Sequence, residues 1–132
     1  MLRITLHDGE KAIVNGAVIK AIGRTQLCVE NKVSILRGRE VMSPQDATTP
    51  ARRLYLACML AYIDPEHRTA HQNMTVEVLR EVMATLPGDD AKVACVRFAN
   101  DIAHAQYYRA LSSARDLIAI EAASHATALP AA

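Results

Sequence analysis

Two histidines in the stretch EHRTAH have a spacing that can bind a metal ion. His67 and His71 are four residues apart, so on a helix both imidazoles lie on one face, an arrangement that zinc enzymes use. Arg68 stands where a zinc protease has the glutamate that acts as general base, and no third ligand is evident nearby. The pattern therefore favours a solvated helix face over a metal-dependent hydrolase, and we expect no catalytic residue, no metal and no cofactor.

Basic side chains are concentrated near the amino terminus. Residues 1–41 hold seven basic and four acidic side chains, a net charge of +3, whereas the remaining 91 residues have a net charge of −2. Guanidinium groups bind phosphate with paired hydrogen bonds and stack on bases, so we expect an anionic partner at this end. The alternative is that these side chains only solvate a sheet and keep its edges from pairing. The candidate nucleic-acid-binding residues are Arg3, His7, Lys11, Lys20, Arg24, Lys32, Arg37 and Arg39.

Tyr107, Tyr108 and Arg109 stand together in the stretch QYYRAL. Aromatic rings beside an arginine could stack on bases. Neighbours on a helix point about 100° apart, however, so the two rings cannot form one flat platform. We therefore predict that one tyrosine belongs to the core, and we take Tyr107, Tyr108 and Arg109 as the candidate interface with a partner protein.

Short apolar runs between turn signals predict strands in the basic region. Residues 2–6 alternate apolar and polar side chains, the two-residue period of a strand with one buried face. Asp8-Gly9 and Asn15-Gly16 supply the positive φ that a tight hairpin needs. We expect five short antiparallel strands in all. The further runs are residues 17–22, 25–30 and 33–37.

The pattern becomes helical from Ser43-Pro44, a typical helix start that Thr49-Pro50 repeats. Residues 51–63 are apolar almost all round, which predicts the most buried helix, and Asp64-Pro65 ends it. Apolar stripes at three- and four-residue spacing predict the later helices, although only Ala105-Gln106 divides the last two, so their separation is open. The stripes are Met74, Val78, Val82 and Leu86 with Leu79 and Met83; Cys95, Phe98, Ala99 and Ile102; and Tyr107, Leu111, Ala114 and Ile118 with Leu117.

These patterns predict an α+β fold. Residues 1–42 form a small antiparallel β-sheet or barrel of about five strands, residues 43–123 form a bundle of three to four α-helices, and residues 124–132 form a flexible tail. Whether the sheet and the helices share one core is left open.

Composition limits the class of protein. The longest apolar run has ten residues, Leu54 to Ile63, whereas a helix that spans a bilayer needs about 20. Cys28, Cys58 and Cys95 are too far apart in sequence to suggest a disulfide frame or a zinc knuckle, and we expect buried free thiols. We therefore expect a soluble, cytoplasmic protein.

Four segments together resemble the FlbT family of flagellum-biosynthesis regulators. They are LRITLHDGEKAIVNGAVI, VSILRGREVM, TPARRLYLACMLAYID and YYRALSSARDLIAIE, in that order from Leu2 to Glu121. The resemblance implies a post-transcriptional regulator that binds the 5′ untranslated region of flagellin mRNA, represses translation and promotes mRNA decay, with no enzymatic activity and no cofactor. Some family members favour flagellar expression instead. Relatives tend to have a Gly-Asp-type turn where this chain has Ala105-Gln106.

The first 41 residues also resemble the small five-stranded RNA-binding regulators of the CsrA type in their order of strands and turns. That resemblance implies an RNA contact along the first and last strands, at Arg3, Arg37 and Arg39, and a dimer. The resulting hypothesis is that the sheet binds the flagellin mRNA leader while the helices mediate dimerisation or docking. The alternative is a flagellar accessory factor that binds flagellin or another regulator and meets RNA only indirectly.

Overall fold

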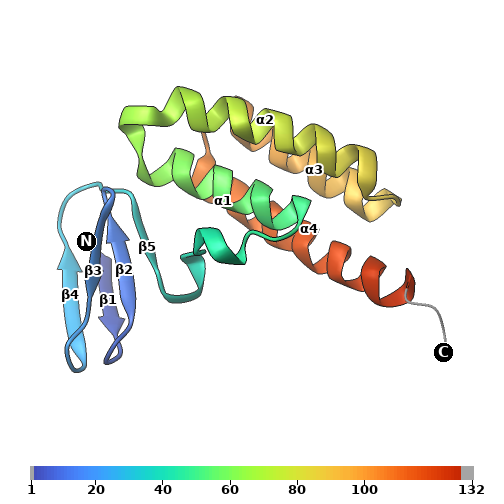
Figure 1. The fold of residues 1–132 in the computed structure, drawn as a ribbon. Helices are drawn as coiled ribbons and strands as arrows, with labels where there is room; N and C mark the ends of the chain where they lie inside the picture. Colours follow the sequence, from blue (N-terminus) through green and yellow to red (C-terminus); the bar gives the residue numbers. More distant parts are fainter. Residues whose placement is uncertain (1, 129–132) are drawn as a thin grey trace.

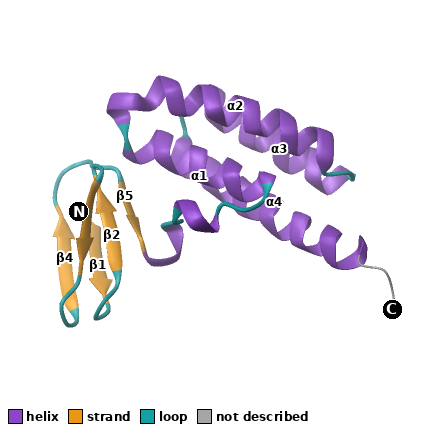
Figure 2. Ribbon diagram, viewed as in Figure 1, coloured by secondary structure: helices purple, strands orange, loops and turns teal. Residues whose placement is uncertain are grey.

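The computed structural model describes residues 2–128, and within them five strands precede four α-helices, which confirms the predicted α+β order (Figure 1). Figure 2 shows the strands gathered at one end of the molecule and the long helices at the other. The strands are β1 (Leu2–Leu6), β2 (Lys11–Val14), β3 (Ala17–Lys20), β4 (Thr25–Val29) and β5 (Ile35–Arg37). The α-helices are α1 (Pro50–Ile63), α2 (Arg68–Thr85), α3 (Asp89–Ala103) and α4 (Tyr107–Ala128). The short 3-10 helices are η1 (Gly38–Glu40), η2 (Pro44–Asp46) and η3 (Pro65–His67).

The strands form two small antiparallel sheets. One sheet pairs β1 with β4, and the other has the order β3-β2-β5. Asn15 and Gly16, with φ of 49° and 86°, make the predicted tight turn between β2 and β3. At the other end of these strands the Gly23 N–H donates to Asp8 Oδ1 at 2.7 Å, which joins the β1–β2 and β3–β4 turns. The conformations and hydrogen bonds of the turns therefore help to hold the strands together.

Two clusters of buried side chains form the core. A small one between the strands consists of Leu6, Ala12 and Ala21, with Leu27 packed against it. The large one fills the helical bundle and also takes in Ile13 of β2 and Leu36 of β5. The second sheet thus shares its inner face with the bundle, which answers the question that the sequence left open.

Helix α1 is the most buried helix, as predicted, and its first turn is capped from two sides. The Arg52 N–H donates to Thr49 Oγ1 at 3.3 Å, and the Ala51 N–H donates to Glu121 Oε2 of α4 at 3.1 Å. A carboxylate at a helix start satisfies a free N–H group and interacts favourably with the helix dipole. This cap joins the first and last helices of the bundle.

The apolar stripe of α2 is rotated from the predicted one. Met74 and Met83 are exposed, and Thr75 is buried beside Val78 and Val82. Thr75 can lie inside because its hydroxyl donates to the His71 carbonyl at 2.7 Å. On α3, Ala99 is exposed while the other three predicted residues are buried.

Three further expectations need correction or completion. Residues 104–106 separate α3 from α4, with Ala105 at a φ of 56°. Residues 124–128 belong to α4 instead of a flexible tail, because alanine-rich sequence propagates a helix that packing has already fixed; residues 129–132 lie outside the described residues. Cys28 is exposed, whereas Cys58 and Cys95 are buried as expected. No helix among the described residues is long and apolar enough to cross a membrane.

Candidate nucleic-acid interface

A groove of about 460 Å³ lies where the sheet meets the helical bundle, and we call it the junction groove. It is lined by the end of β1, the segment 37–40 that follows β5, and the start of α4. Segments far apart in sequence therefore meet in it. Its charged and aromatic members are His7, Glu10, Arg37, Arg39, Glu40 and Tyr108.

The turn after β5 positions both arginines of the groove. Gly38 has a φ of 55°, and a Cβ atom there would lie 2.8 Å from Glu10 Oε2, so glycine suits this position in two ways. Arg37 stands before this glycine and Arg39 after it, and both side chains are exposed. Within residues 2–128 neither guanidinium group forms an ion pair. Both are free to contact a ligand.

The two carboxylates of the groove bind backbone N–H groups. Glu10 Oε1 accepts from the His7 N–H at 3.0 Å, and Glu40 Oε1 accepts from the Arg37 N–H at 3.2 Å. These bonds fix the strand ends from which the basic side chains project. The groove thus holds two carboxylates beside its two guanidinium groups, and each carboxylate is fixed by a backbone N–H group.

Tyr108 brings an aromatic ring from α4 into the groove. Its hydroxyl donates to Glu40 Oε2 at 2.5 Å, and its ring lies 5.4 Å from the Tyr62 ring of α1. The bond to Glu40, aided by partial burial, raises the pKa of Tyr108 to about 12. The phenol therefore stays a donor at neutral pH, and 49% of the residue remains exposed.

A neighbouring slot of about 340 Å³ opens beside the junction groove and shares Arg37, Glu40 and Tyr108 with it. Its remaining walls are apolar side chains of β1 and of the segment 33–35, together with Tyr62. The Ile35 N–H donates to the Tyr62 hydroxyl at 3.3 Å, so the aromatic wall also supports β5. A surface with charges of both signs thus continues into a slot whose other walls are apolar side chains and two aromatic rings.

The structure does not bring all eight predicted basic residues together. His7, Arg37 and Arg39 share the junction groove. Arg3 lines a separate surface hollow with Cys28, its partner across the β1–β4 pair. The other four are dispersed along the strands and turns. Lys11 and Lys20 face each other across β2 and β3, Arg24 lies in the β3–β4 turn, and Lys32 lies in the β4–β5 connection at the opposite end of β4.

The three residues of the predicted partner interface diverge. Tyr107 is buried, with 6% exposure, and the Arg68 guanidinium lies 5.4 Å from its ring, so it belongs to the core. Arg109 is exposed, and its Nε lies 3.8 Å from Oδ1 of Asp101 on α3. Tyr108 lines the junction groove instead. No local sequence signal reveals this, because Tyr108 and its partner Glu40 are 68 residues apart.

A second polar cluster lies at the corner between α1 and α2. Both predicted histidines contact Asp64: His67 Nδ1 at 3.1 Å from Oδ2, and His71 Nε2 at 2.9 Å from the same oxygen. The hydrogen bond with His71 is the largest cause that lowers the pKa of the Asp64 carboxyl, and His67 adds to it. The sequence argued against a metal-dependent hydrolase from the missing glutamate at Arg68 and from the lack of an evident third ligand, and the Asp64 carboxylate answers the second of these arguments.

Comparison with known proteins places the chain in a family. The model of the family described as "Flagellar protein FlbT" matches residues 2–124. A relative from Caulobacter sp. (strain K31) is 33% identical over 121 residues, which cover 91% of this chain and 92% of that protein. One from Bradyrhizobium diazoefficiens is 34% identical over 122 residues, with 91% and 82% covered. These relatives are named probable flagellum biosynthesis repressor proteins. No solved structure matches the chain. With the family model matched over nearly its whole length, the chain belongs to the FlbT family.

Proposed function

We propose that this protein regulates flagellum biosynthesis by binding the 5′ untranslated region of flagellin mRNA, where it represses translation or promotes decay of the message. The names of its relatives, which describe repressors of flagellum biosynthesis, support the regulatory role. The observation that carries the RNA part is the junction groove, where two guanidinium groups that form no ion pair within residues 2–128 stand beside the half-exposed Tyr108. The protein then acts in the cytoplasm, without a cofactor and without catalysis.

The groove suits a single strand. Arg37 and Arg39 contact successive phosphates, which supplies most of the affinity and little sequence discrimination. Bases of a single-stranded loop are free to leave the backbone and stack on an aromatic ring. Tyr108 offers such a ring at the mouth of the apolar slot, next to the phosphate-binding side chains. A base in the slot gives the interface its sequence preference.

The double variant Arg37→Ala/Arg39→Ala tests the phosphate contacts. We expect binding to a flagellin leader to weaken by about 2 to 4 kcal/mol. Each phosphate contact on a single strand contributes about 0.7 to the slope of log affinity against log salt, so the slope falls by about 1.4. The matched control is Arg80→Ala/Lys92→Ala, which removes the same charge from exposed positions on α2 and α3. Equal binding by the two double variants across salt concentrations contradicts the proposed surface.

Replacing Tyr108 separates stacking from hydrogen bonding. Tyr108→Ala removes the ring and is expected to cost about 1 to 3 kcal/mol of RNA affinity. Tyr108→Phe keeps the ring and loses only the bond to Glu40, so we expect it to bind nearly as the parent does. If the phenylalanine variant loses as much affinity as the alanine variant, the ring does not stack on a base.

A second function is favoured by a surface far from the sheet. A hollow of about 430 Å³ between α3 and α4 has four apolar and three charged residues in its lining, and Val93 among them is exposed. Such a surface suits a flagellar accessory factor that docks on flagellin or another regulator and meets RNA only through it. Purified protein and leader RNA, with no other component, separate the two functions. Binding that needs an added flagellar protein favours the accessory factor. A homodimer stays a prediction in both cases.

A further inference from the structure

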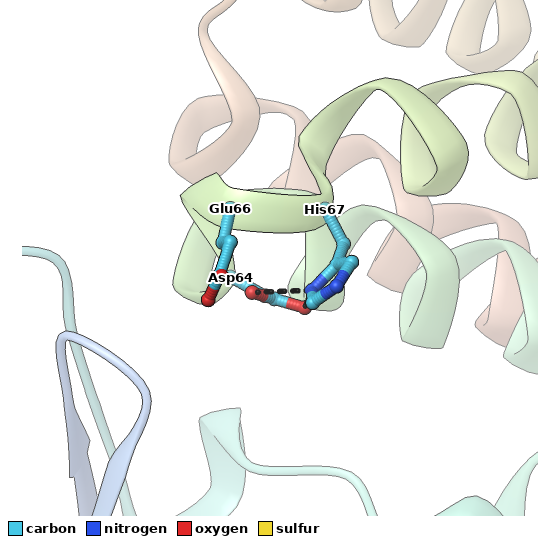
Figure 3. Close-up of side chains that lie close together, drawn as sticks. All are labelled: Asp64, Glu66 and His67. Atoms are coloured by element: carbon cyan, nitrogen blue, oxygen red, sulfur yellow. Dashed lines mark hydrogen bonds and ion pairs between the residues drawn. The ribbon is translucent and has the colours of Figure 1, made fainter.

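The corner between α1 and α2 carries metal-ligating side chains outside the junction groove. Figure 3 shows Asp64, Glu66 and His67 projecting to the same side of the η3 segment. One ligand atom from each lies within 4.8 Å of the other two. From this geometry we propose that the corner binds one divalent transition-metal ion of the zinc type, with Asp64, Glu66 and His67 as its protein ligands.

Two of the ligand side chains already lie side by side, because His67 Nδ1 forms a hydrogen bond with the Asp64 carboxylate that an ion would replace with little movement. Asp64 Oδ1 lies 3.3 Å from His67 Nδ1. Ligand atoms that each lie about 2.0 to 2.1 Å from a tetrahedral zinc ion are about 3.3 Å apart from one another. Glu66 is exposed, and one of its carboxylate oxygens lies within 4.8 Å of a ligand atom of each of the other two residues.

His71 positions the Asp64 carboxylate and is not itself a ligand in this site. Its Nε2 lies 2.9 Å from Oδ2, the oxygen other than the one assigned to the ion. The side chain of His71 is much less exposed than that of His67, so it is suited to hold the carboxylate from behind. Carboxylates that bind a metal are commonly fixed by such hydrogen bonds. Of the two histidines, His67 is thus a metal ligand and His71 holds the Asp64 carboxylate in place.

The chemical types of the three ligands indicate which class of ion binds. An imidazole with two carboxylates suits zinc, cobalt or nickel, whereas magnesium and calcium prefer oxygen ligands alone. Arg68, the adjacent basic residue, does not compete for the carboxylates. Its Nε donates to the Ala61 carbonyl at 2.8 Å, and its guanidinium lies over the Tyr107 ring.

The ion would link the end of α1 to the start of α2, at a corner that also contacts the β2–β3 turn. Asp64 directly follows α1, and His67 directly precedes α2. The preceding residue, Ile63, presents its carbonyl oxygen to the β2–β3 turn, 3.3 Å from where a Cβ of Gly16 would lie. Metal binding is therefore expected to stabilise the α1–α2 hairpin and the turn that rests on it, independently of any RNA contact.

Calorimetric titration of the full chain with zinc chloride tests the site. All variants carry Cys28→Ser, because the exposed Cys28 thiol could bind zinc by itself. We expect one zinc ion per chain and a higher midpoint of thermal denaturation with zinc than without it. Asp64→Asn, Glu66→Gln and His67→Gln should each weaken zinc binding by at least about 10-fold, and His71→Gln by about 10-fold.

The control is His104→Ala, which removes an exposed histidine at the end of α3 and should leave zinc binding unchanged. His67→Gln keeps the test decisive if Asp64→Asn fails to fold, because the His67 side chain is mostly exposed. Failure of the parent to bind zinc, or binding by His67→Gln as tight as by His104→Ala, overturns the site. Unchanged affinity in His71→Gln overturns the positioning role of His71.

Discussion

The two sheets and the helical bundle bury apolar surface to very different extents. Among residues 2–128, the cluster between the strands has Leu6, Ala12 and Ala21 as its buried members, whereas the bundle has a large core that also includes side chains of β2 and β5. The strand region also leaves Val18 of β3 and Ile22 of the β3–β4 turn exposed, at 65% and 94%. The bundle therefore supplies most of the free energy of folding, while the strands serve to present side chains.

Three tyrosines of the bundle support the strand region at the junction. Tyr55 donates its hydroxyl to the Glu40 carbonyl at 2.8 Å, Tyr62 accepts from the Ile35 N–H, and Tyr108 donates to the Glu40 side chain. Each of these bonds ends on the segment from β5 to η1, which also carries the arginines of the junction groove. The rigid part of the molecule thus positions the part proposed to bind RNA.

The largest expected effect comes from emptying the core of the bundle. Phe98 is fully buried in α3, so Phe98→Ala should lower the free energy of unfolding by about 3 to 5 kcal/mol. Val18→Ala on β3 should change it by less than about 0.5 kcal/mol, because Val18 is already exposed. Urea denaturation followed by circular dichroism measures both. Similar losses for the two variants would mean that the strands contribute as much stability as the bundle.

The next largest effect concerns the cap that joins α4 to α1. Glu121 is 6% exposed and accepts from the Ala51 N–H. Glu121→Ala leaves that N–H group buried without an acceptor and should cost about 2 to 3 kcal/mol of stability. Glu121→Gln keeps an acceptor and loses the charge, so it should cost less. Equal unfolding free energies for the parent and the alanine variant would show that the cap contributes nothing.

A smaller effect is expected where the strands touch the bundle. Gly16→Ala places a side chain at positive φ and 3.3 Å from the Ile63 carbonyl oxygen, and Gly23 has a similar φ with open space around it. The positive φ alone should lower the free energy of unfolding by about 1 to 2 kcal/mol in each alanine variant. Gly16→Ala should lower the free energy of unfolding more than Gly23→Ala does, because only the new Cβ at residue 16 comes close to the Ile63 carbonyl oxygen. The reverse order, measured by urea denaturation, would remove this contact from the junction.

Local patterns predicted most of the secondary structure. Asn15-Gly16 placed the β2–β3 turn, and Thr49-Pro50 placed the start of α1, because each signal acts through its own backbone. The exposure of Met74 and Met83 was not predictable in the same way. Both fit a helical stripe, but the orientation of α2 follows from its packing against α1, and Thr75 takes the inner position through a bond to its own helix.

Sequence patterns likewise could not show which candidate site residues meet in the folded protein. Charge alone pointed to Arg37 and Arg39, but it could not separate them from Arg24 and Lys32, which lie elsewhere. The ring of Tyr108 and the carboxylate of Glu40 meet only through the tertiary fold. Contacts between residues far apart in sequence depend on how whole elements pack, and a single sequence carries no direct record of that packing.

The smallest effect concerns the break between α3 and α4, which the sequence marked only weakly. Ala105 has a φ of 56°, a conformation that costs a residue with a Cβ about 1 to 2 kcal/mol and glycine almost nothing. Replacing Ala105 with glycine removes this cost. It also gives the unfolded chain more conformational freedom, which offsets about 0.4 to 1 kcal/mol of the stabilisation. Ala105→Gly should therefore stabilise the protein by about 0.5 to 1 kcal/mol.

The control for that change is Ala103→Gly, at the last residue of α3, which should destabilise the protein by up to about 1 kcal/mol. The two substitutions alter the same atoms two residues apart, so opposite signs in urea denaturation isolate the backbone conformation as the cause. Destabilisation by both would mean that the chain does not hold Ala105 at positive φ in solution. The last two helices would then be joined by a looser connection, and α4 would carry Tyr108 to the junction groove less rigidly.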